Sequence, residues 1–419
     1  MTIRGVRGTR DILPDEIPVW QTLERAAHDL LGRYAYREIR TPVFEETELF
    51  ARGIGAETDI VTKEMYTFDD RDGSSLTLRP EATAGIVRAV IEHNLMNTDP
   101  ALKVYALGPM FRRERPQKGR YRQFHQLDVE AFGFTSPTID AEMIEVAIGY
   151  LEACGVTRHE LVLNSVGDRN CRPAYVETLR EALREHAPNM CGDCQRRTET
   201  NPLRVLDSKR PEDAPLIAGA PLMIDHLSDD AAAHFAAVRA GLDLLGIDYE
   251  ISPRLVRGLD YYLRTTFEFA ADALDAAQNA VGGGGRYDGL VEQLGGPATP
   301  GIGFALGVDR ILLACDAEGA FAGPSESVSV FVVDLTGGAE ALRLLDGLAR
   351  AGIDADRAYD NRSVKAQFKA ADRSGARLAL VVGDDELAAD IVQIKDLVSG
   401  DQHAVARPDL LPELRKHLP

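Results

Sequence analysis

Apolar residues recur at helical spacing in three stretches of the N-terminal part of the chain. The pattern predicts helices over Ile17–Tyr34 and Thr138–Ala153. A third helix is predicted to begin at Pro80, because proline is favoured at the first position of a helix. The apolar positions of this third helix follow the helical period: Ala84, Val87, Ile91 and Leu95.

Between these helices lie segments that are typical of strands joined in hairpins. Arg37–Phe50 has an extended pattern, and Thr67–Pro80 is predicted to form a hairpin that turns at Asp72-Gly73. Ala101–Phe111 and Gln123–Phe134 are two further predicted strands. Because hairpin-linked strands alternate with helices, we expect an α+β fold with an antiparallel sheet flanked by helices, rather than a doubly wound parallel sheet.

Beyond Asp168 the pattern becomes mostly helical. Helical periodicity covers Arg172–Glu185 and Ala231–Leu245, on either side of a loop that contains cysteines and prolines. Strand-like, glycine-rich sequence resumes at Arg254 and continues to about Ala314. We therefore expect a helical insertion between two parts of one core.

A compact α/β domain of the βαβ kind is predicted at the C-terminal end, after a linker at Ala320–Glu326. Two helix-length segments separate its first three strands, and a hairpin follows. The predicted strands are Val328–Asp334, Ile353–Arg357, Leu378–Val382, Ile391–Leu397 and Gln402–Ala406. The resulting division of the chain is 1–167 and 251–320 for the core, 168–250 for the insertion and 327–419 for the C-terminal domain.

Charge narrows the range of functions. The 419 residues include 47 Lys plus Arg and 66 Asp plus Glu, a net charge of −19. This balance argues against a protein that coats nucleic acid non-specifically, although local basic patches could still bind RNA. Because the chain starts without an apolar leader and has no run of about 18 apolar residues, we expect a cytoplasmic protein without a membrane span.

The five cysteines do not suggest a disulfide framework, since their number is odd and their spacing is scattered. Cys191 and Cys194 form a single CxxC. Zinc could bind there if Cys171 and a histidine joined the pair. Reduced cysteines near a turn are the favoured interpretation, so no metal site is predicted.

The strongest candidate for chemistry is a basic loop between two predicted strands, Arg112–Arg122. It holds six cations and a single acid, Glu114, and its Pro116 and Gly119 prevent a helix. Guanidinium groups bind phosphate oxygens in pairs, so such a loop could wrap a polyphosphate. A solvated charge run is the alternative, and the strand–loop–strand setting weighs against it.

Four other segments carry weaker signals. Glu81 and Thr83 could bind an ammonium group or cap the predicted helix, and on local evidence capping is favoured. Arg257, in a segment with two tyrosines, could serve an anion and a flat heterocycle, or belong to an ordinary strand. The glycine run Gly282–Gly289 permits close approach of a ligand to the backbone, or forms a flexible turn. In Gly301–Arg310, small residues end a predicted strand and lead into a helix that ends near Ala314, and Arg310 could face a phosphate or a local acid.

Together and in this order, these segments resemble the class II aminoacyl-tRNA synthetases, and specifically the histidine–tRNA ligase family. Pro42 and its flanks are similar to the first motif of the class. FRRERPQKGRYRQFHQ resembles the second motif and GFALGVDR the third. LVRGLDYYLRTTFEF and GGGGRYDGL are similar to two signatures of the histidine enzymes. The resemblance spans the whole chain.

The resemblance implies an enzyme that joins L-histidine to ATP as histidyl-adenylate, releases pyrophosphate and then transfers histidine to the 3′-terminal adenosine of histidine tRNA. It also implies a homodimer, built through the first motif, and ATP with Mg²⁺ as a substrate rather than a tightly bound cofactor. The C-terminal domain would bind the anticodon.

The resemblance assigns a role to each matching residue. The histidine site would comprise Glu81, Thr83 and Gln126 for the amino group, Glu130 and Tyr262 for the ring nitrogens, and Tyr261 and Tyr287 as walls, together with Arg112 and Arg257. The ATP site would comprise Arg112, Glu114, Arg120 and Arg310. Arg257 is the implied electrostatic catalyst, in place of one magnesium ion of other class II enzymes, and Arg112 acts with it at the α-phosphate.

Contacts to tRNA are expected in two regions. Gln117 and Arg122 of the basic loop resemble residues that meet the acceptor end of the tRNA. In the C-terminal domain the basic residues Arg362, Lys365, Lys369 and Arg373 recur at helical spacing, with Val364, Phe368 and Ala371 on the opposite face. An RNA contact or a solvated helix face would both explain this stripe.

One alternative function shares the same core: the non-catalytic, synthetase-like regulatory subunit of ATP phosphoribosyltransferase. That subunit generally lacks the anticodon-binding domain and loses catalytic residues. This chain keeps Arg257, Gln126, Glu130 and a full C-terminal domain, which favours the enzyme.

Overall fold

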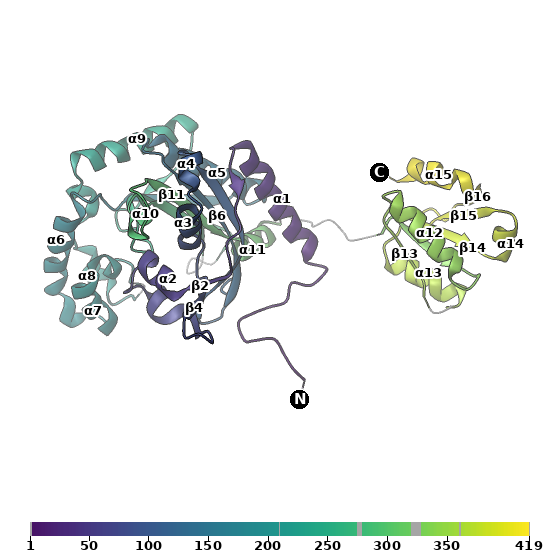
Figure 1. The fold of residues 1–419 in the computed structure, drawn as a ribbon, viewed down its shortest axis with the longest axis horizontal. Coiled ribbons are helices and arrows are strands. Elements are labelled where there is room, and N and C mark those ends of the chain that lie inside the picture. Colours follow the sequence, from purple (N-terminus) through teal and green to yellow (C-terminus); the bar gives the residue numbers. More distant parts are fainter. Residues whose placement is uncertain (1, 209, 275–278, 320–327, 360–361, 419) are drawn as a thin grey trace. The chain divides into compact units, whose positions relative to one another are not determined.

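The computed structural model describes residues 2–208, 210–274, 279–319, 328–359 and 362–418. The chain divides into two compact units, Met1–Gly323 and Pro324–Pro419, each of which contains its own sheet and helices (Figure 1). The predicted linker at Ala320–Glu326 lies outside the described residues.

An eight-stranded sheet forms the centre of the first unit. Its strands, in spatial order, are β1 (Arg37–Glu38), β5 (Lys103–Phe111), β6 (Gln123–Phe132), β11 (Gly301–Gly307), β10 (Ala280–Arg286), β9 (Leu263–Ala271), β7 (His159–Ser165) and β8 (Glu250–Ile251). Neighbouring strands are antiparallel, except that β1 and β8 pair in parallel at the two edges. The predicted α+β fold with an antiparallel sheet flanked by helices is therefore confirmed.

Helices cover one face of this sheet, and the opposite face carries a second hydrophobic cluster together with the polar residues of β6. The helices α1 (Ile17–Arg33), α5 (Thr138–Ala153) and α11 (Val308–Glu318) contribute to the same hydrophobic core as alternate residues of β6: Leu127, Val129 and Ala131. Because side chains alternate along a strand, the intervening Gln126, Asp128 and Glu130 point to the opposite face.

A smaller layer lies beside that polar face. It contains an antiparallel sheet and short helices: β2 (Phe44–Glu46), β3 (Tyr66–Asp69), β4 (Ser75–Leu78), α2 (Thr47–Ile54), the π-helical turn η1 (Ile60–Glu64), α3 (Thr83–Glu92), α4 (Leu95–Thr98) and α10 (Leu290–Gln293). The hairpin predicted over Thr67–Pro80 is present as β3 and β4.

Two boundaries in this layer differ from the sequence predictions. Residues 47–50 of the segment predicted as extended are helical, since α2 begins at Thr47. The helix predicted from Pro80 begins only at Thr83. The carbonyl oxygen of Pro80, before the helix, accepts a hydrogen bond from Arg112 Nε at 2.9 Å.

The predicted helical insertion contains more helix than its sequence pattern indicates. Its helices are α6 (Arg172–Arg184), η2 (Ala187–Asn189), α7 (Gly192–Thr200), η3 (Pro202–Val205), α8 (Ala214–Ala218), η4 (Met223–His226) and α9 (Asp229–Leu245). They pack around a separate hydrophobic cluster, and Figure 1 shows α6 to α9 as a teal group on one side of the unit.

The segment after this group is also less regular than predicted. Residues 254–262 form turns and irregular backbone rather than a strand, and β9 begins at Leu263. The helix that follows β11 continues to Glu318, beyond the predicted end near Ala314.

The second unit is a five-stranded sheet covered on both faces. Its strands, in spatial order, are β13 (Ala355–Arg357), β12 (Val330–Asp334), β14 (Leu378–Val382), β15 (Ile391–Asp396) and β16 (Gln402–Ala406). The predicted helices are α12 (Ala339–Arg350) and α13 (Val364–Arg373); α14 (Asp384–Ala388), η5 (Arg407–Asp409) and α15 (Leu410–His417) were not predicted. Successive residues of β12 enter two different clusters, which explains its unbroken apolar run.

Among the residues that the structure describes, every helix is too short or too polar to cross a membrane.

Candidate active site

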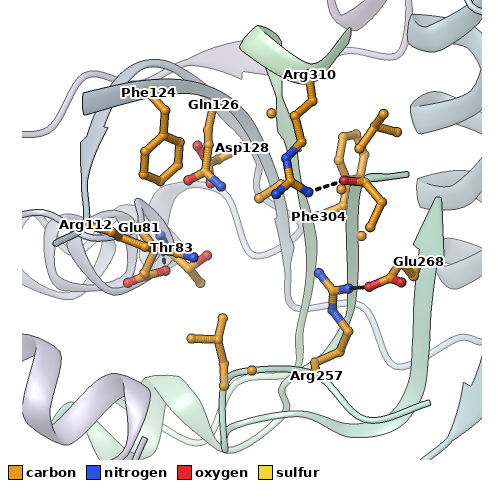
Figure 2. A pocket seen from close by; sticks show the side chains of 18 of the residues that line it. Glu81, Thr83, Arg112, Phe124, Gln126, Asp128, Arg257, Glu268, Phe304 and Arg310 are labelled. Atoms are coloured by element: carbon orange, nitrogen blue, oxygen red, sulfur yellow. Dashed lines mark hydrogen bonds and ion pairs between the residues drawn. The ribbon is translucent and has the colours of Figure 1, made fainter. Parts of the chain in front are cut away.

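A cavity of about 480 Å³ opens on the polar face of the eight-stranded sheet. Eleven of the predicted site residues line it: Glu81, Thr83, Arg112, Glu114, Arg120, Gln126, Arg257, Tyr261, Tyr262, Tyr287 and Arg310. Figure 2 shows Glu81, Thr83 and Arg112 on one side of the cavity, and Arg257 and Glu268 across from them. Segments that are far apart in the sequence therefore meet at one site.

At the start of α3, Glu81 does what the capping interpretation predicted. Its carboxylate accepts hydrogen bonds from the backbone N–H of Thr83, at 2.8 Å, and of Ala84, at 2.9 Å. The side chain also faces the cavity, and burial raises the pKa of its carboxyl group. An ammonium group bound here would offset the energetic cost of burying the ionised carboxylate. Glu81 can therefore both cap the helix and bind an ammonium group.

Glu130 lies one layer behind the cavity wall, with 1% of its surface exposed. Its carboxylate accepts hydrogen bonds from Thr83 Oγ1, at 2.6 Å, and from the Tyr287 hydroxyl. On the neighbouring strand a Cβ at Gly303 would lie 1.6 Å from Glu130 Oε2, so only glycine leaves room for this carboxylate. Burial raises the pKa of Glu130 well above its ordinary value.

Three tyrosines form an aromatic corner of the cavity. The ring centroids of Tyr261 and Tyr262 are 4.7 Å apart, and those of Tyr261 and Tyr287 are 5.6 Å apart. Burial raises the pKa of all three hydroxyls, that of Tyr262 to about 12. The hydroxyls therefore stay neutral near pH 7 and can donate or accept a hydrogen bond.

Arg257 lies on the turn before β9 and forms an ion pair with Glu268. Its guanidinium lies close to the backbone of β10, where a Cβ at Gly283 would be 3.0 Å from Arg257 Cζ. Its carbonyl oxygen accepts a hydrogen bond from Arg204 Nη1, at 2.8 Å, so η3 supports its backbone. Sequence analysis missed Glu268, although a lone acid within the apolar strand β9 was a detectable signal.

Three further guanidinium groups reach the cavity from the basic loop and from α11. Arg112 stacks on Phe124, with 5.4 Å between Cζ and the ring centroid. Arg120 lies 3.4 Å from Glu114. Arg310 donates to the carbonyl oxygens of Gly119 and Ala280, and burial together with the nearby Arg120 lowers its pKa. Four arginines, including Arg257, thus line the same cavity.

Asp128 is a second residue that sequence analysis missed. It lines the cavity with 0% of its surface exposed, and its two carboxylate oxygens have no hydrogen-bond partner among the described residues. Burial raises its pKa well above the ordinary value, a shift that Arg79 and Arg112 partly oppose. The sequence signal that could have indicated Asp128 is its position two residues after Gln126, which places both side chains on the same face of β6.

Replacing Asp128 with asparagine is expected to stabilise the free protein. An acid whose pKa is raised by folding binds protons more readily when folded, so its contribution to stability falls as pH rises from the unfolded towards the folded pKa. Asp128→Asn should raise the free energy of unfolding at pH 7 by about 1–3 kcal/mol and flatten its pH dependence above pH 4. Urea denaturation between pH 4 and 8 measures both effects, and an unfolding free energy unchanged from the parent at pH 7 would contradict this account.

The remaining predicted residues are not among those that line the cavity. Gln117 forms an isolated bridge with Arg120 at the tip of the basic loop, and the Arg122 backbone N–H donates to the Gly8 carbonyl at 2.7 Å. Arg362, Lys365 and Lys369 belong to the second unit.

The basic stripe of the second unit is shorter than predicted. Arg362 is not on the helix, because the cap residue Ser363 follows it and α13 begins at Val364. Lys365 and Lys369 are exposed on α13. Val364 was predicted on the buried face but is 44% exposed in the first helical turn. Gln367 is buried instead and donates to the Asp334 carbonyl at 2.8 Å.

Comparisons with known proteins agree with this geometry. The model of the histidyl-tRNA synthetase family matches residues 8–311, and the model of the anticodon binding domain matches residues 329–417. The histidine–tRNA ligase of Koribacter versatilis (strain Ellin345) is 51% identical over 430 residues, which cover 99% of this chain and 96% of that protein. The histidine–tRNA ligase of Solibacter usitatus (strain Ellin6076) is 49% identical over 415 residues, which cover 98% and 99%.

Solved structures show the same fold. The crystal structure of apo S. aureus histidyl-tRNA synthetase is similar with a TM-score of 0.84 and 40% identity, over 99% of this chain and 100% of that chain. A Bacillus halodurans C structure described as an ATP phosphoribosyltransferase regulatory subunit/histidyl-tRNA synthetase has a TM-score of 0.59 and 20% identity, over 85% of this chain and 93% of that chain.

Proposed function

The chain belongs to the histidyl-tRNA synthetase family, and from that premise we propose how its cavity carries out the reaction. The protein is a class II aminoacyl-tRNA synthetase that ligates histidine to its tRNA. One observation carries the proposal: buried carboxyl groups and guanidinium groups line the same cavity. Acids suit the amino end of histidine, and guanidinium groups suit a carboxylate and a polyphosphate.

Histidine would occupy the end of the cavity near α3 and the tyrosines. Glu81, with Thr83 and Gln126, would bind the ammonium group, which supplies the positive charge that buried carboxylates require. The buried Asp128 lies close enough to Glu81 for their charges to interact and would strengthen that attraction. The Gln126 Oε1 atom has no partner among the described residues, so it is free to accept from the substrate.

The imidazole ring would lie in the aromatic corner. A ring with one donor and one acceptor nitrogen needs two polar partners, which Glu130 and Tyr262 would provide. Glu130 would keep its present hydrogen bonds from Thr83 and Tyr287 and act on the ring through those side chains, or it would exchange one of these bonds for a direct bond from the ring. An amino acid without those ring nitrogens would leave buried polar groups unpaired and would be rejected.

ATP, with Mg²⁺ as part of the substrate, would bind along the arginines. Arg112 would contact the α-phosphate, Arg120 and Glu114 the outer part of the nucleotide, and Arg310 the adenine or the γ-phosphate. A histidine carboxylate oxygen attacks the α-phosphorus and the bond to pyrophosphate breaks. Arg257 would stabilise the charge that develops at the α-phosphate.

In the second step, the terminal hydroxyl of tRNA attacks the histidyl carbonyl carbon and AMP leaves. Neither step forms a covalent bond to the protein, so no cysteine or histidine nucleophile is required. Gln117 and Arg122 would meet the acceptor end of the tRNA. The core would comprise 1–167 and 251–320, the insertion 168–250 and the anticodon-binding domain 327–419. We further propose a cytoplasmic homodimer, as the class implies.

Exchange of labelled pyrophosphate into ATP tests this function directly. We expect exchange that depends on histidine and takes place without tRNA, because the first step needs only histidine and ATP. No exchange with any amino acid would refute the enzyme, and exchange with another amino acid would refute the substrate. The Bacillus halodurans C structure gives little support to the alternative function as a regulatory subunit, because a likeness at 20% identity shows only the fold.

Charge reversal on α13 tests the role of the second unit. Lys365→Glu with Lys369→Glu should raise the Michaelis constant for tRNA by about tenfold at moderate salt, because two phosphate contacts would be replaced by repulsion. Pyrophosphate exchange should stay unchanged, since it does not use the anticodon. The neutral pair Lys365→Gln and Lys369→Gln serves as the matched control and should show a smaller effect. A tRNA Michaelis constant equal to that of the parent would favour the solvated-face interpretation.

A further inference from the structure

Two cysteines and a buried aspartate, none of which lines the cavity, converge in the helical insertion. Cys191 and Cys194 flank the start of α7, and Asp213 immediately precedes α8. One ligand atom from each of the three residues lies within 4.8 Å of the other two. Cys194 is 1% exposed and Asp213 is 0% exposed, so the cluster is shielded from water on the side of the protein core.

Contacts within the cluster hold these atoms in place. Cys194 Sγ lies 3.2 Å from Asp213 Oδ2, and Ser208 Oγ donates to the same oxygen at 2.7 Å. The Cys191 backbone N–H donates to Asp213 Oδ1 at 3.1 Å. The Cys194 N–H points to Cys191 Sγ, at 3.4 Å between N and Sγ. The donor atoms therefore face one another because the backbone of two separate segments orients them.

We propose that this cluster is a zinc site in which Cys191, Cys194 and Asp213 supply three ligands. Donor atoms bound to one tetrahedral zinc lie roughly 3.5–3.8 Å apart, so the observed spacing needs only small shifts. The Ser208 hydroxyl, which already contacts Asp213, or a water molecule completes the coordination. Two thiolates favour zinc over magnesium or calcium, which prefer oxygen ligands.

The ligand set differs from the one that the sequence suggested. Zinc was considered only if Cys171 and a histidine joined the CxxC pair, and the favoured interpretation was reduced cysteines without metal. Cys171 instead lies 3.2 Å from Asp168 Oδ1, beside the backbone of its own turn. Asp213 takes the third position, 19 residues after Cys194, which no local spacing rule indicates.

The location of the site connects it to the active site. The helix α7 that starts at the cysteines carries Arg197, which forms an ion pair with Asp59 of the core. The following η3 carries Arg204, whose Nη1 donates to the Arg257 carbonyl at 2.8 Å. Bound zinc would tie both ends of this segment together and so keep the backbone of Arg257 in place.

Metal binding can be measured without any assay of activity. The full-length protein, purified under reducing conditions, should contain about one zinc per chain by elemental analysis. Cobalt(II) added to metal-free protein should give visible ligand-field bands and a thiolate-to-cobalt charge-transfer band at a one-to-one end point. Cys191→Ser with Cys194→Ser should abolish the charge-transfer band, and Asp213→Asn should weaken affinity for the metal at least tenfold.

Cys171→Ser is the matched control, because it changes a buried thiol of the same insertion outside the cluster, and it should bind one cobalt normally. The proposal is overturned if the reduced parent protein binds no stoichiometric zinc or cobalt, or if its cobalt spectrum lacks thiolate charge transfer. A disulfide between Cys191 and Cys194 that persists in mild reductant would also overturn it. None of these readouts depends on histidine or ATP, so failure here leaves the proposed function intact.

Discussion

Replacing Arg257 with alanine is expected to slow histidine-dependent pyrophosphate exchange by about 100–1,000-fold, the usual cost of removing one preorganised group that stabilises transition-state charge. Arg257 is suited to this role because its guanidinium is held by Glu268 and its backbone by Arg204. The change should affect the maximal rate more than the Michaelis constants, since the charge it stabilises develops during the reaction.

The controls for this variant separate charge from structure. Arg257→Lys keeps the positive charge but loses the planar donor set, so its rate should lie between those of the parent and the alanine variant. Arg254→Ala removes an arginine from the same turn that contacts the Ile217 and Ala218 carbonyls and does not line the cavity. It should retain exchange within a few-fold. Exchange by Arg257→Ala at near the parent rate would remove Arg257 from the mechanism.

Glu130→Gln is expected to lower kcat/KM for histidine by at least about 100-fold, because the neutral amide oxygen is a weaker acceptor for the imidazole N–H than an ionised carboxylate, and the amide adds N–H donors to the site. The loss of activity in this variant should not be accompanied by a loss of stability. Burial raises the pKa of Glu130, so the ionised carboxylate destabilises the folded state as pH rises, and removing it should maintain or raise the free energy of unfolding at pH 7.

Tyr287→Phe is the matched control for Glu130. It removes one of the two hydrogen bonds to the carboxylate but leaves the charge and the bond from Thr83 in place. Its kcat/KM should therefore fall by only about tenfold. Steady-state adenylation kinetics and urea denaturation of both variants provide the comparison. If Glu130→Gln kept kcat/KM within a few-fold of the parent, Glu130 would be a structural residue rather than a histidine-binding one.

The strand β6 shows which features of the active site a sequence pattern predicts and which it does not. Alternation along β6 predicts that Gln126, Asp128 and Glu130 share one face, but it does not distinguish their surroundings. Gln126 and Asp128 line the cavity, whereas Glu130 lies behind Thr83 and Tyr287. That difference depends on α3 and on β10 and β11, which enter the site from remote parts of the chain.

The sequence by itself determined the antiparallel α+β core and the βαβ character of the C-terminal domain, because local periodicity encodes them. Through the resemblance of its motifs to a known family, it also indicated eleven of the residues that line the cavity. Only the tertiary structure decided three other features: the start of α3 at Thr83, the pairing of Arg257 with Glu268, and the convergence of Asp213 with Cys191 and Cys194. Each depends on contacts between segments that are distant in the chain. Such contacts arise from three-dimensional packing, which residue spacing does not specify.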